Sequence, residues 1–258
     1  PYITFAVQKQ PHMSADIFLR KGLTIPMSGT ADLNISSADS ADNFVIYPHD
    51  FHGVVPKMLL REGEAVLQGQ PIFYSKANPE IKFVSPVSGT LTKIERGAKR
   101  RIMSLSIASD GKNKAVTHSL EKLDKLEAAD VKKHLLESGC WPFVKQRPYD
   151  VIADPDSTPK AIFISGFSTA PLAADVPFIL SSQKEDFQNG INALAKLTPK
   201  VHLSVDASSA SFLTEVSNAE IHRVKGQHPA GNVGVQVHHI DPVNAGETGW
   251  VVGTAAVE

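Results

Sequence analysis

Imidazole side chains could bind a metal ion at two places in this sequence, because neutral histidine is a common metal ligand. His49 and His52 lie on either side of Asp50 in a stretch that reads as a loop, where the two histidines could converge. His238 and His239 are adjacent in an alternating run that favours a strand. Neighbours on a strand point to opposite faces and cannot easily share an ion. Since neither place offers a third clustered ligand, we predict no metal site.

A lysine on a tight hairpin could carry a covalently attached group. Residues 61–97 contain the segments E-G-E-x-V-x-x-G-Q and S-P-V-S-G-T-L, which resemble the paired motifs of the biotinyl/lipoyl-type barrel-sandwich. Lys76 lies on the hairpin between them, but it is followed by Ala-Asn-Pro-Glu rather than flanked by the small or sulfur-bearing neighbours of a carrier lysine. We therefore expect Lys76 to be an unmodified lysine on a solvated turn.

Patterns for other chemistry are missing from the sequence. It contains neither the G-x-S-x-G of a serine hydrolase nor the H-E-x-x-H of a zinc protease. Cys140 has no histidine within the local signatures of a cysteine nucleophile, and its pairing with Trp141 reads as core packing. The loop that starts at Gly166 has one glycine and a proline, so it is neither a dinucleotide fingerprint nor a P-loop. We predict no catalytic residue and no cofactor-binding residue in this chain.

The elements that would position these residues change character along the chain. Residues 61–97 alternate apolar β-formers with closely spaced glycines, which is typical of short strands joined by tight turns in a small β-sandwich. We expect Gly63, Gly89 and Gly97 to hold turns at positive φ, where other side chains would clash. The β signal continues to about residue 119, and residues 121–138 then carry leucines at helical spacing ahead of a glycine.

Beyond that helix the pattern is that of an α/β domain. The run 160–165 is almost continuously apolar, as in a strand covered on both faces. A helix within 178–197 and a strand at 200–205 complete a β-α-β unit, which implies a parallel sheet. A further helix around 210–217 and a strand at 219–224 would extend it.

The sequence thus predicts a mixed, α+β chain of two domains. A β-rich barrel-sandwich domain occupies 13–120, and an α/β, Rossmann-like domain with a parallel sheet occupies 121–258. Pro1 is not an initiator and Met13 could be, so we expect residues 1–12 to be an added or upstream extension. The chain stops soon after a predicted strand at 250–252, and we expect it to be a fragment.

Composition excludes several classes of function. Lys and Arg number 26 against 27 Asp and Glu, for a formal net charge of -1, so no overall field attracts nucleic acid or an anionic membrane. The basic run at 96–101 reads as a solvated turn, with a docking patch for an acidic partner as the alternative. The single cysteine excludes an internal disulfide, a Cys-rich zinc site and a thiolate-held iron–sulfur cluster within the chain, and indicates a reducing compartment. No run reaches the roughly 18 apolar residues of a membrane span.

Collinear motifs that cover nearly the whole chain after Met13 resemble one family. They are I-F-L-R-K-G-L-T-I-P-M-S-G at 17–29, L-R-E-G-E-A-V at 60–66, S-P-V-S-G at 85–89, E-R-G-A-K-R at 95–100, E-S-G-C-W at 137–141, R-P at 147–148, P-L-A-A-D at 171–175 and H-P-A-G at 228–231. The family is that of the A subunits of the sodium-translocating NADH:quinone oxidoreductase, a bacterial respiratory membrane complex. Its members run well past the end of this chain, so the resemblance also implies an N-terminal fragment.

The resemblance implies a subunit without a cofactor of its own. Related subunits, in the Rnf-type electron-transport complex and in complex I, carry a glycine-rich flavin loop after the helix. Here residues 139–149 read G-C-W-P-F-V-K-Q-R-P-Y, with bulky side chains where glycines would let FMN approach. FMN, FAD, riboflavin and iron–sulfur centres are then expected in partner subunits. A flavin- or nucleotide-binding dehydrogenase subunit of the related electron-transport complex is the alternative.

The implied function is that of a peripheral subunit on the cytoplasmic side of the bacterial inner membrane. Its complex would oxidise NADH, reduce ubiquinone or menaquinone and export sodium, with the other subunits as partners and no nucleic acid. The isolated chain is not expected to be catalytic. Quinone contact by this subunit has been proposed for the family, and an apolar pocket for it could be lined by four aromatic residues: Trp141, Phe143, Phe163 and Phe167.

Overall fold

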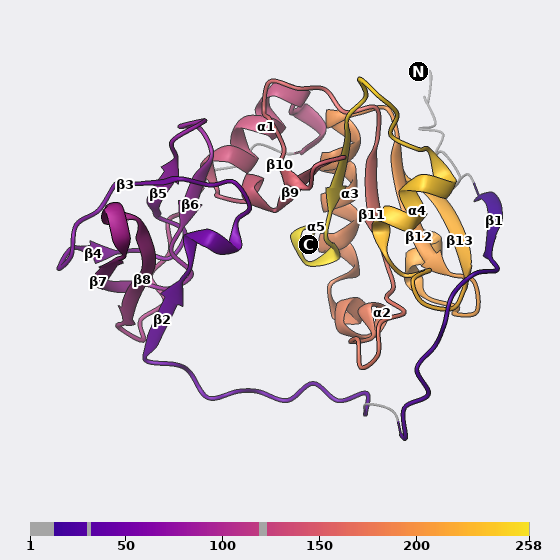
Figure 1. Cartoon of the computed structure of the whole chain (residues 1–258), viewed down its shortest axis with the longest axis horizontal. Coiled ribbons are helices and arrows are strands. Elements are labelled where there is room, and N and C mark those ends of the chain that lie inside the picture. The colour runs from indigo at the N-terminus through magenta and orange to yellow at the C-terminus, as the bar shows by residue number, and fades with distance from the viewer. Residues whose placement is uncertain (1–12, 30–31, 119–122, 258) are drawn as a thin grey trace, which may run out of the picture. The chain divides into compact units, whose positions relative to one another are not determined.

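The computed structural model describes residues 13–29, 32–118 and 123–257. They divide into two compact units. Ser36–Ser157 form the barrel-sandwich unit, and the residues from Thr158 onward, together with the described residues up to Ile35, form the α/β unit (Figure 1). Within these ranges, no helix has the length and apolar character needed to cross a membrane.

Two antiparallel sheets form the core of the barrel-sandwich unit, with strand orders β2-β8-β7-β4 and β3-β5-β6. Ile72, Phe73, Leu91, Leu105 and Ile107 are fully buried. Leu91 and Ile107 each lie between more exposed neighbours on β7 and β8, which is the alternation of a two-layer sandwich. The strands are β2 (Asn43–Ile46), β3 (Pro56–Met58), β4 (Ala65–Val66), β5 (Pro71–Ser75), β6 (Lys82–Val84), β7 (Gly89–Arg96) and β8 (Ile102–Ser109).

The three turn glycines have different roles. Gly63 has the expected positive φ, at 87°. For Gly89 and Gly97 the expectation of positive φ is wrong: Gly97 has a φ of -93°, and Gly89 opens β7 outside the positive range. A Cβ on Gly89 would lie 1.9 Å from the carbonyl oxygen of Ala108 in β8, so glycine is needed there for the close approach of two backbones.

A short helical segment completes the barrel-sandwich unit. Helix α1 (Ala128–Glu137) begins at a capping box, in which the side chains of Glu127 and Asp130 each accept from the other's backbone N–H. This helix confirms the one expected within 121–138, and a short 3-10 turn, η3 (Leu123–Lys125), precedes it. After a second 3-10 turn, η4 (Trp141–Phe143), the strands β9 (Val144–Arg147) and β10 (Val151–Ile152) pair in antiparallel fashion.

The α/β unit is built on parallel strands in the order β1-β13-β12-β11-β14. Helix α3 (Lys184–Leu197) connects β11 to β12 and buries Phe187, Ile191 and Leu194, so the predicted β-α-β unit is confirmed. The strands are β1 (Met13–Leu19), β11 (Ile162–Ser165), β12 (Val201–Asp206), β13 (Glu220–Gly226) and β14 (Gly249–Val252), and the other helices are α2 (Val176–Ile179), α4 (Val233–Ile240) and α5 (Thr254–Val257).

The first strand lies in a different unit from the one that local pattern indicated. Residues 13–120 read as one β domain, but β1 pairs in parallel with β13, with Ile17 opposite Val224. At the other end, the barrel-sandwich unit continues to Ser157 rather than stopping at residue 120. A parallel pair joins distant segments of a chain, so this strand's partner leaves no local signature.

Two predicted elements of the α/β unit have the wrong type. Residues 233–240 form helix α4 rather than a strand. Their valines alternate, but Val233, Val237 and Ile240 also recur at helical spacing, and all three belong to or pack against an apolar cluster that includes the buried Phe163. The helix expected around 210–217 is a single 3-10 turn, η6 (Phe212–Glu215).

Candidate functional site

An apolar hollow in the barrel-sandwich unit is lined by aromatic rings from three segments. The ring of Phe51 stands edge-on to that of Phe83, with centroids 4.6 Å apart, and its centroid lies 6.3 Å from that of Phe143. Phe83 in turn stacks on the buried Phe73 at 4.4 Å. We call this space, of about 150 Å³, the aromatic hollow; its lining residues are Ile46, Phe51, Phe83, Val84, Pro86, Gly139, Pro142 and Phe143.

Local sequence explains how the hollow is built. Gly139 follows α1 with a φ of +77°, and a Cβ there would lie 2.4 Å from a methyl carbon of Val84. Only glycine therefore lets the end of the helix approach β6 so closely. The 3-10 turn that follows places Phe143 at the surface, with 53% of the residue exposed.

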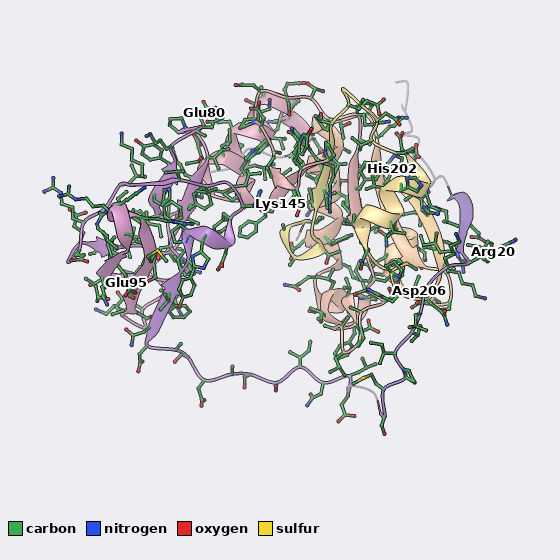
Figure 2. The ribbon with its side chains drawn as sticks, in the orientation of Figure 1. Arg20, Glu80, Glu95, Lys145, His202 and Asp206 are labelled. Atoms are coloured by element: carbon green, nitrogen blue, oxygen red, sulfur yellow. The ribbon has the colours of Figure 1, made fainter. Side chains whose placement is uncertain are left out.

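The chemistry of the hollow suits a flat apolar ring. A cavity of roughly 150 Å³ lined by apolar side chains holds one benzene-sized ring. The ammonium group of Lys145, which is labelled in Figure 2, lies 5.9 Å from the centroid of Phe51, a ring that lines this hollow. A cation at that place could donate a hydrogen bond to an oxygen on the edge of a bound ring.

Among the four aromatic residues proposed for a quinone pocket, only Phe143 lines this hollow. Trp141 is fully buried, and its indole N–H donates to the carbonyl of Ala153 at 2.8 Å. Phe163 is buried in the α/β unit against Val237, and Phe167 is half-buried in the loop after β11. Trp141 and Phe163 therefore offer no surface to a ligand.

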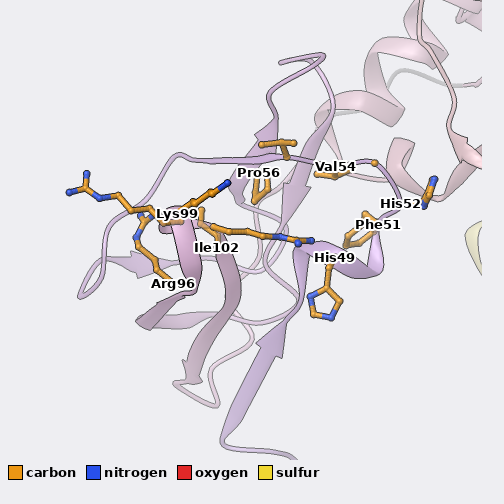
Figure 3. A pocket seen from close by; sticks show the side chains of 12 residues that line it. His49, Phe51, His52, Val54, Pro56, Arg96, Lys99 and Ile102 are labelled. Carbon is orange, nitrogen blue, oxygen red and sulfur yellow. Dashed lines mark hydrogen bonds between the residues drawn. The ribbon is translucent and has the colours of Figure 1, made fainter.

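A second cavity, which we call the cationic pocket, shares the lining residue Phe51 with the aromatic hollow. Figure 3 shows the side chains that line the cationic pocket. Its volume is about 670 Å³. It is lined by His49, Phe51, His52, Gly53, Val54, Val55, Pro56, Arg96, Lys99, Arg100, Arg101 and Ile102, none of which carries a carboxylate. Lys99 and Arg100 have φ values of 53° and 59°, which are unusual for residues other than glycine.

The residues considered for metal binding, covalent modification or nucleophilic chemistry are exposed or line the cationic pocket. His49 and His52 both line the cationic pocket, where neighbouring cations would repel a metal ion. Lys76 is exposed on its hairpin. Cys140 is exposed, so its expected place in the core is wrong, and only its neighbour Trp141 is buried. His238 and His239 are exposed on α4, with ring centroids 5.1 Å apart.

Sequence reasoning missed a cluster of ionisable residues on the sheet of the α/β unit. His202 Nδ1 lies 2.9 Å from His222 Nε2 and 3.3 Å from a carboxylate oxygen of Glu220. Both histidines are almost fully buried. Burial lowers the pKa of His202 to about 4. The carboxylate of Asp241 opposes this shift, whereas the charge of Lys200 lowers the pKa further. Burial, helped by His202, also lowers the pKa of His222 to about 4.

Only the strand register could have revealed this cluster. His202 and His222 lie within two predicted strands, where His202 stands between Val201 and Leu203 and His222 between Ile221 and Arg223. Their meeting depends on β12 and β13 being neighbours with His202 opposite Glu220, and periodicity does not specify such a pairing.

Comparison with known proteins places both units in one family. Residues 17–110 match the model of the NqrA N-terminal barrel-sandwich hybrid domain. Residues 126–257 match that of the NqrA second alpha/beta domain. The predicted order of a barrel-sandwich domain and an α/β domain is therefore confirmed.

Relatives from three bacteria are each named as the A subunit of the Na(+)-translocating NADH-quinone reductase. The protein of Haemophilus influenzae (strain PittGG) is 37% identical over 238 residues, which are 91% of this chain and 53% of that protein. The protein of Actinobacillus succinogenes is 36% identical over 237 residues, with 91% and 53% covered. The protein of Neisseria gonorrhoeae (strain NCCP11945) is 35% identical over 239 residues, with 92% and 54% covered.

This chain spans about half the length of the curated relatives it matches. The two family matches follow each other in order and between them include the cationic pocket, the aromatic hollow and the histidine cluster. The chain therefore belongs to the NqrA family, the A subunits of the Na(+)-translocating NADH-quinone reductase.

Proposed function

We propose that this chain acts as a peripheral, cofactor-free subunit of a membrane complex that couples NADH oxidation and quinone reduction to sodium export. Its family membership carries this proposal, since the relatives bear the name of that enzyme's A subunit. The chain would lie on the cytoplasmic side of the inner membrane and have the other subunits as partners. Chemistry would take place on cofactors of those partners: FMN, FAD, riboflavin and iron–sulfur centres.

The absence of a flavin is proposed from the segment that follows α1. In this chain Trp141 and Val144 are buried side chains of the barrel-sandwich unit, and Gly139 is packed against Val84. A flavin loop here would need free backbone N–H groups and open space, so the packing of these residues supports the proposal. A flavin-binding dehydrogenase subunit of the related electron-transport complex is the second candidate, and it is favoured only by kinship between the two families.

The cationic pocket is proposed as the contact with a partner subunit. Its lysine and three arginines face no lining carboxylate, so an acidic surface of a partner would complement them. The turn that presents Lys99 and Arg100 holds both in left-handed conformations, which cost free energy in residues other than glycine. This conformation supports a role for the turn beyond solvation.

Affinity capture of the tagged chain from detergent-solubilised bacterial membranes tests this proposal. We expect captured partner subunits that release flavin on denaturation, and none released by the chain purified alone. The double variant Lys99→Glu, Arg100→Glu should capture partners roughly tenfold less well, because it places like charges across the interface. The matched control Lys112→Glu, Lys114→Glu makes the same charge change on a surface loop after β8 and should leave capture unchanged.

Two outcomes of that capture would count against the proposal. Flavin bound stoichiometrically to the chain alone would favour the dehydrogenase alternative. Equal loss of partners in both double variants would show that net charge matters rather than the cationic pocket.

Quinone binding is proposed at the aromatic hollow. The ring would lie in the hollow against the edges of Phe51 and Phe143, which contact each other, and the ammonium group of Lys145 would face a quinone oxygen. Of the four aromatic residues first considered, this proposal keeps Phe143, because Trp141 and Phe163 are buried and Phe167 lies in the other unit. Ubiquinone, a benzoquinone, and menaquinone, a naphthoquinone, both contain a 1,4-quinone ring, which is the part that the hollow would accept.

Truncating Phe143 to alanine should weaken the binding of a short-chain ubiquinone by about tenfold. The loss of one aromatic contact costs about 1.4 kcal/mol of binding free energy, which corresponds to a factor of about ten in affinity. Isothermal titration calorimetry on the folded variant measures the effect. The control is Tyr149→Ala, which removes an aromatic ring that is 80% exposed in the same unit and should not change the affinity. Unchanged quinone affinity in Phe143→Ala would contradict the proposed pocket.

A further inference from the structure

Three metal-ligating side chains converge on the sheet of the α/β unit. The atoms concerned are Nδ1 of His202, Nε2 of His222 and a carboxylate oxygen of Glu220, and all lie within 4.8 Å of one another. Among the described residues, this is the group of three histidine, cysteine or acidic side chains with the spacing of a metal site. It lies outside both cavities of the barrel-sandwich unit.

The backbone holds these three residues in fixed positions. In the parallel pair β12 and β13, His202 stands opposite Glu220, and Ser204 stands opposite His222. Residues two apart on a strand point to the same face of the sheet. All three ligands therefore project from one face, one from β12 and two from the neighbouring β13. Ligands on paired strands are more rigidly positioned than ligands on loops.

We propose that His202, Glu220 and His222 bind one Zn²⁺ ion. Two imidazole nitrogens and one carboxylate oxygen are a donor set that zinc accepts, whereas calcium and magnesium prefer oxygen ligands alone. Ligands at about 2.0–2.1 Å from a tetrahedral zinc ion are separated by roughly 3.3–3.4 Å. The distances of 2.9 Å and 3.3 Å from His202 Nδ1 are close to that value, so a small opening of the histidine pair would admit the ion.

Access and coordination number follow from burial. His202 and His222 are 4% and 6% exposed, whereas the side chain of Glu220 is 45% exposed. The ion would therefore enter beside Glu220, and a water molecule on that side would complete the tetrahedron. On the neighbouring strand β11, the buried ring of Phe163 stacks on that of His202, with centroids 5.1 Å apart.

The contact between the two rings indicates which nitrogens would bind the ion, because Nδ1 of His202 and Nε2 of His222 face each other at 2.9 Å. The hydrogen that joins the two rings would move to the other nitrogen of the ring that carries it, and each ring would stay neutral. Nε2 of His202 is buried without a hydrogen-bond partner in the described part of the chain, which leaves Nδ1 as the nitrogen through which this ring makes its polar contacts.

The site lies at the amino ends of the two strands, since His202 is the second residue of β12 and Glu220 the first of β13. Open α/β sheets bind nucleotides at the opposite, carboxyl ends of their strands. The ion would thus cross-link two neighbouring strands rather than act on a nucleotide, and it is independent of the quinone and partner sites proposed above.

The experiment is a zinc titration of the full chain after dialysis against EDTA, followed by calorimetry. We expect one Zn²⁺ per chain. The Glu220→Gln variant should bind at least about tenfold more weakly and His222→Gln more weakly still, since each loses a ligand. His238→Gln, which removes an exposed histidine of α4, is the matched control and should bind as the parent does. Substitution by Co²⁺ should give the visible absorption of a tetrahedral nitrogen and oxygen site.

Glu220→Gln keeps the test decisive if His222→Gln fails to fold, because Glu220 is partly exposed and its amide has the same shape. Absence of stoichiometric zinc binding in the parent chain would overturn the proposal. It would also be overturned by unchanged affinity in folded Glu220→Gln, or by an equal loss in His238→Gln, which would indicate binding by surface histidines.

Discussion

Replacing Gly89 by valine should destabilise the barrel-sandwich unit by roughly 3 kcal/mol or more, a value at the upper end for overpacking substitutions. The added Cβ would lie 1.9 Å from the carbonyl oxygen of Ala108, 2.8 Å from its carbonyl carbon and 3.0 Å from Cα of Ser109. All three are backbone atoms of β8, so no side chain can rotate away, and the strand itself must shift. Gly89 also pairs with Val66 of β4, which restricts movement in the other direction.

A matched variant separates close approach from backbone conformation. Gly63 has a φ of +87°, but a Cβ there meets nothing within 4 Å. Gly63→Val should therefore cost only the conformational strain, on the order of 1 to 3 kcal/mol. Gly89→Val should cost more, although its φ is ordinary.

Thermal unfolding of the whole chain measures the melting temperatures of both variants. Amide hydrogen exchange then shows, residue by residue, which unit has lost protection. We expect Gly89→Val to lower the melting temperature of Ser36–Ser157 by roughly 10 °C or more, while amides in α3 and β12 keep their protection. A Gly89→Val chain as stable as the parent would contradict the close packing of β7 and β8.

The extent to which sequence predicts this fold depends on how local each feature is. The strands within 61–97 and the β-α-β unit around α3 follow from periodicity and turn residues, and the structure confirms them. The partner of β1 does not follow, because its pairing with β13 is set by tertiary contacts. The prediction of a strand in place of helix α4 is wrong because its valines satisfy both periods.

The same distinction between local features and tertiary contacts applies to the candidate site. Phe143 could be singled out as an aromatic residue next to a glycine-ended helix, but no local pattern indicates its meeting with Phe51, which lies on a distant segment. Trp141, two residues away, is buried by the same turn that exposes Phe143. A 3-10 turn directs neighbouring side chains to different sides, and composition alone cannot say which side faces the core.

Acidification from pH 7 to pH 4 should destabilise the α/β unit by several kcal/mol because of His202 and His222. Burial lowers the pKa of each from 6.5 to about 4 in the folded chain, while in the unfolded chain both return to ordinary values. Well above pH 6.5 neither state binds a proton at these rings, so they no longer make the stability change with pH. As the pH falls below 6.5, the unfolded chain takes up protons that the folded chain refuses, and stability is lost until the pH reaches about 4.

The size of this effect follows from the pKa difference between the two states. A change from 6.5 to about 4 corresponds to roughly 3 kcal/mol for one histidine at full effect. The two rings are in contact, so their contributions are coupled and the pair titrates as a unit. Since domains are stable by about 5–15 kcal/mol, even one such contribution is a large share of the total.

Urea unfolding at pH values between 7.5 and 5.0, in the presence of EDTA, measures the loss directly. Carboxylates titrate mostly below this range, so the slope of the unfolding free energy between pH 6.5 and 5.0 reports on histidines. The variant His222→Gln removes one buried titrating ring, and its slope should be markedly shallower than that of the parent chain, even if its stability at pH 7.5 is lower. His238→Gln removes an exposed ring instead and should keep the parent slope. A parent chain whose stability is flat across this range would mean that the two rings accept protons in the folded state, which their burial between β12, β13 and the Phe163 ring opposes.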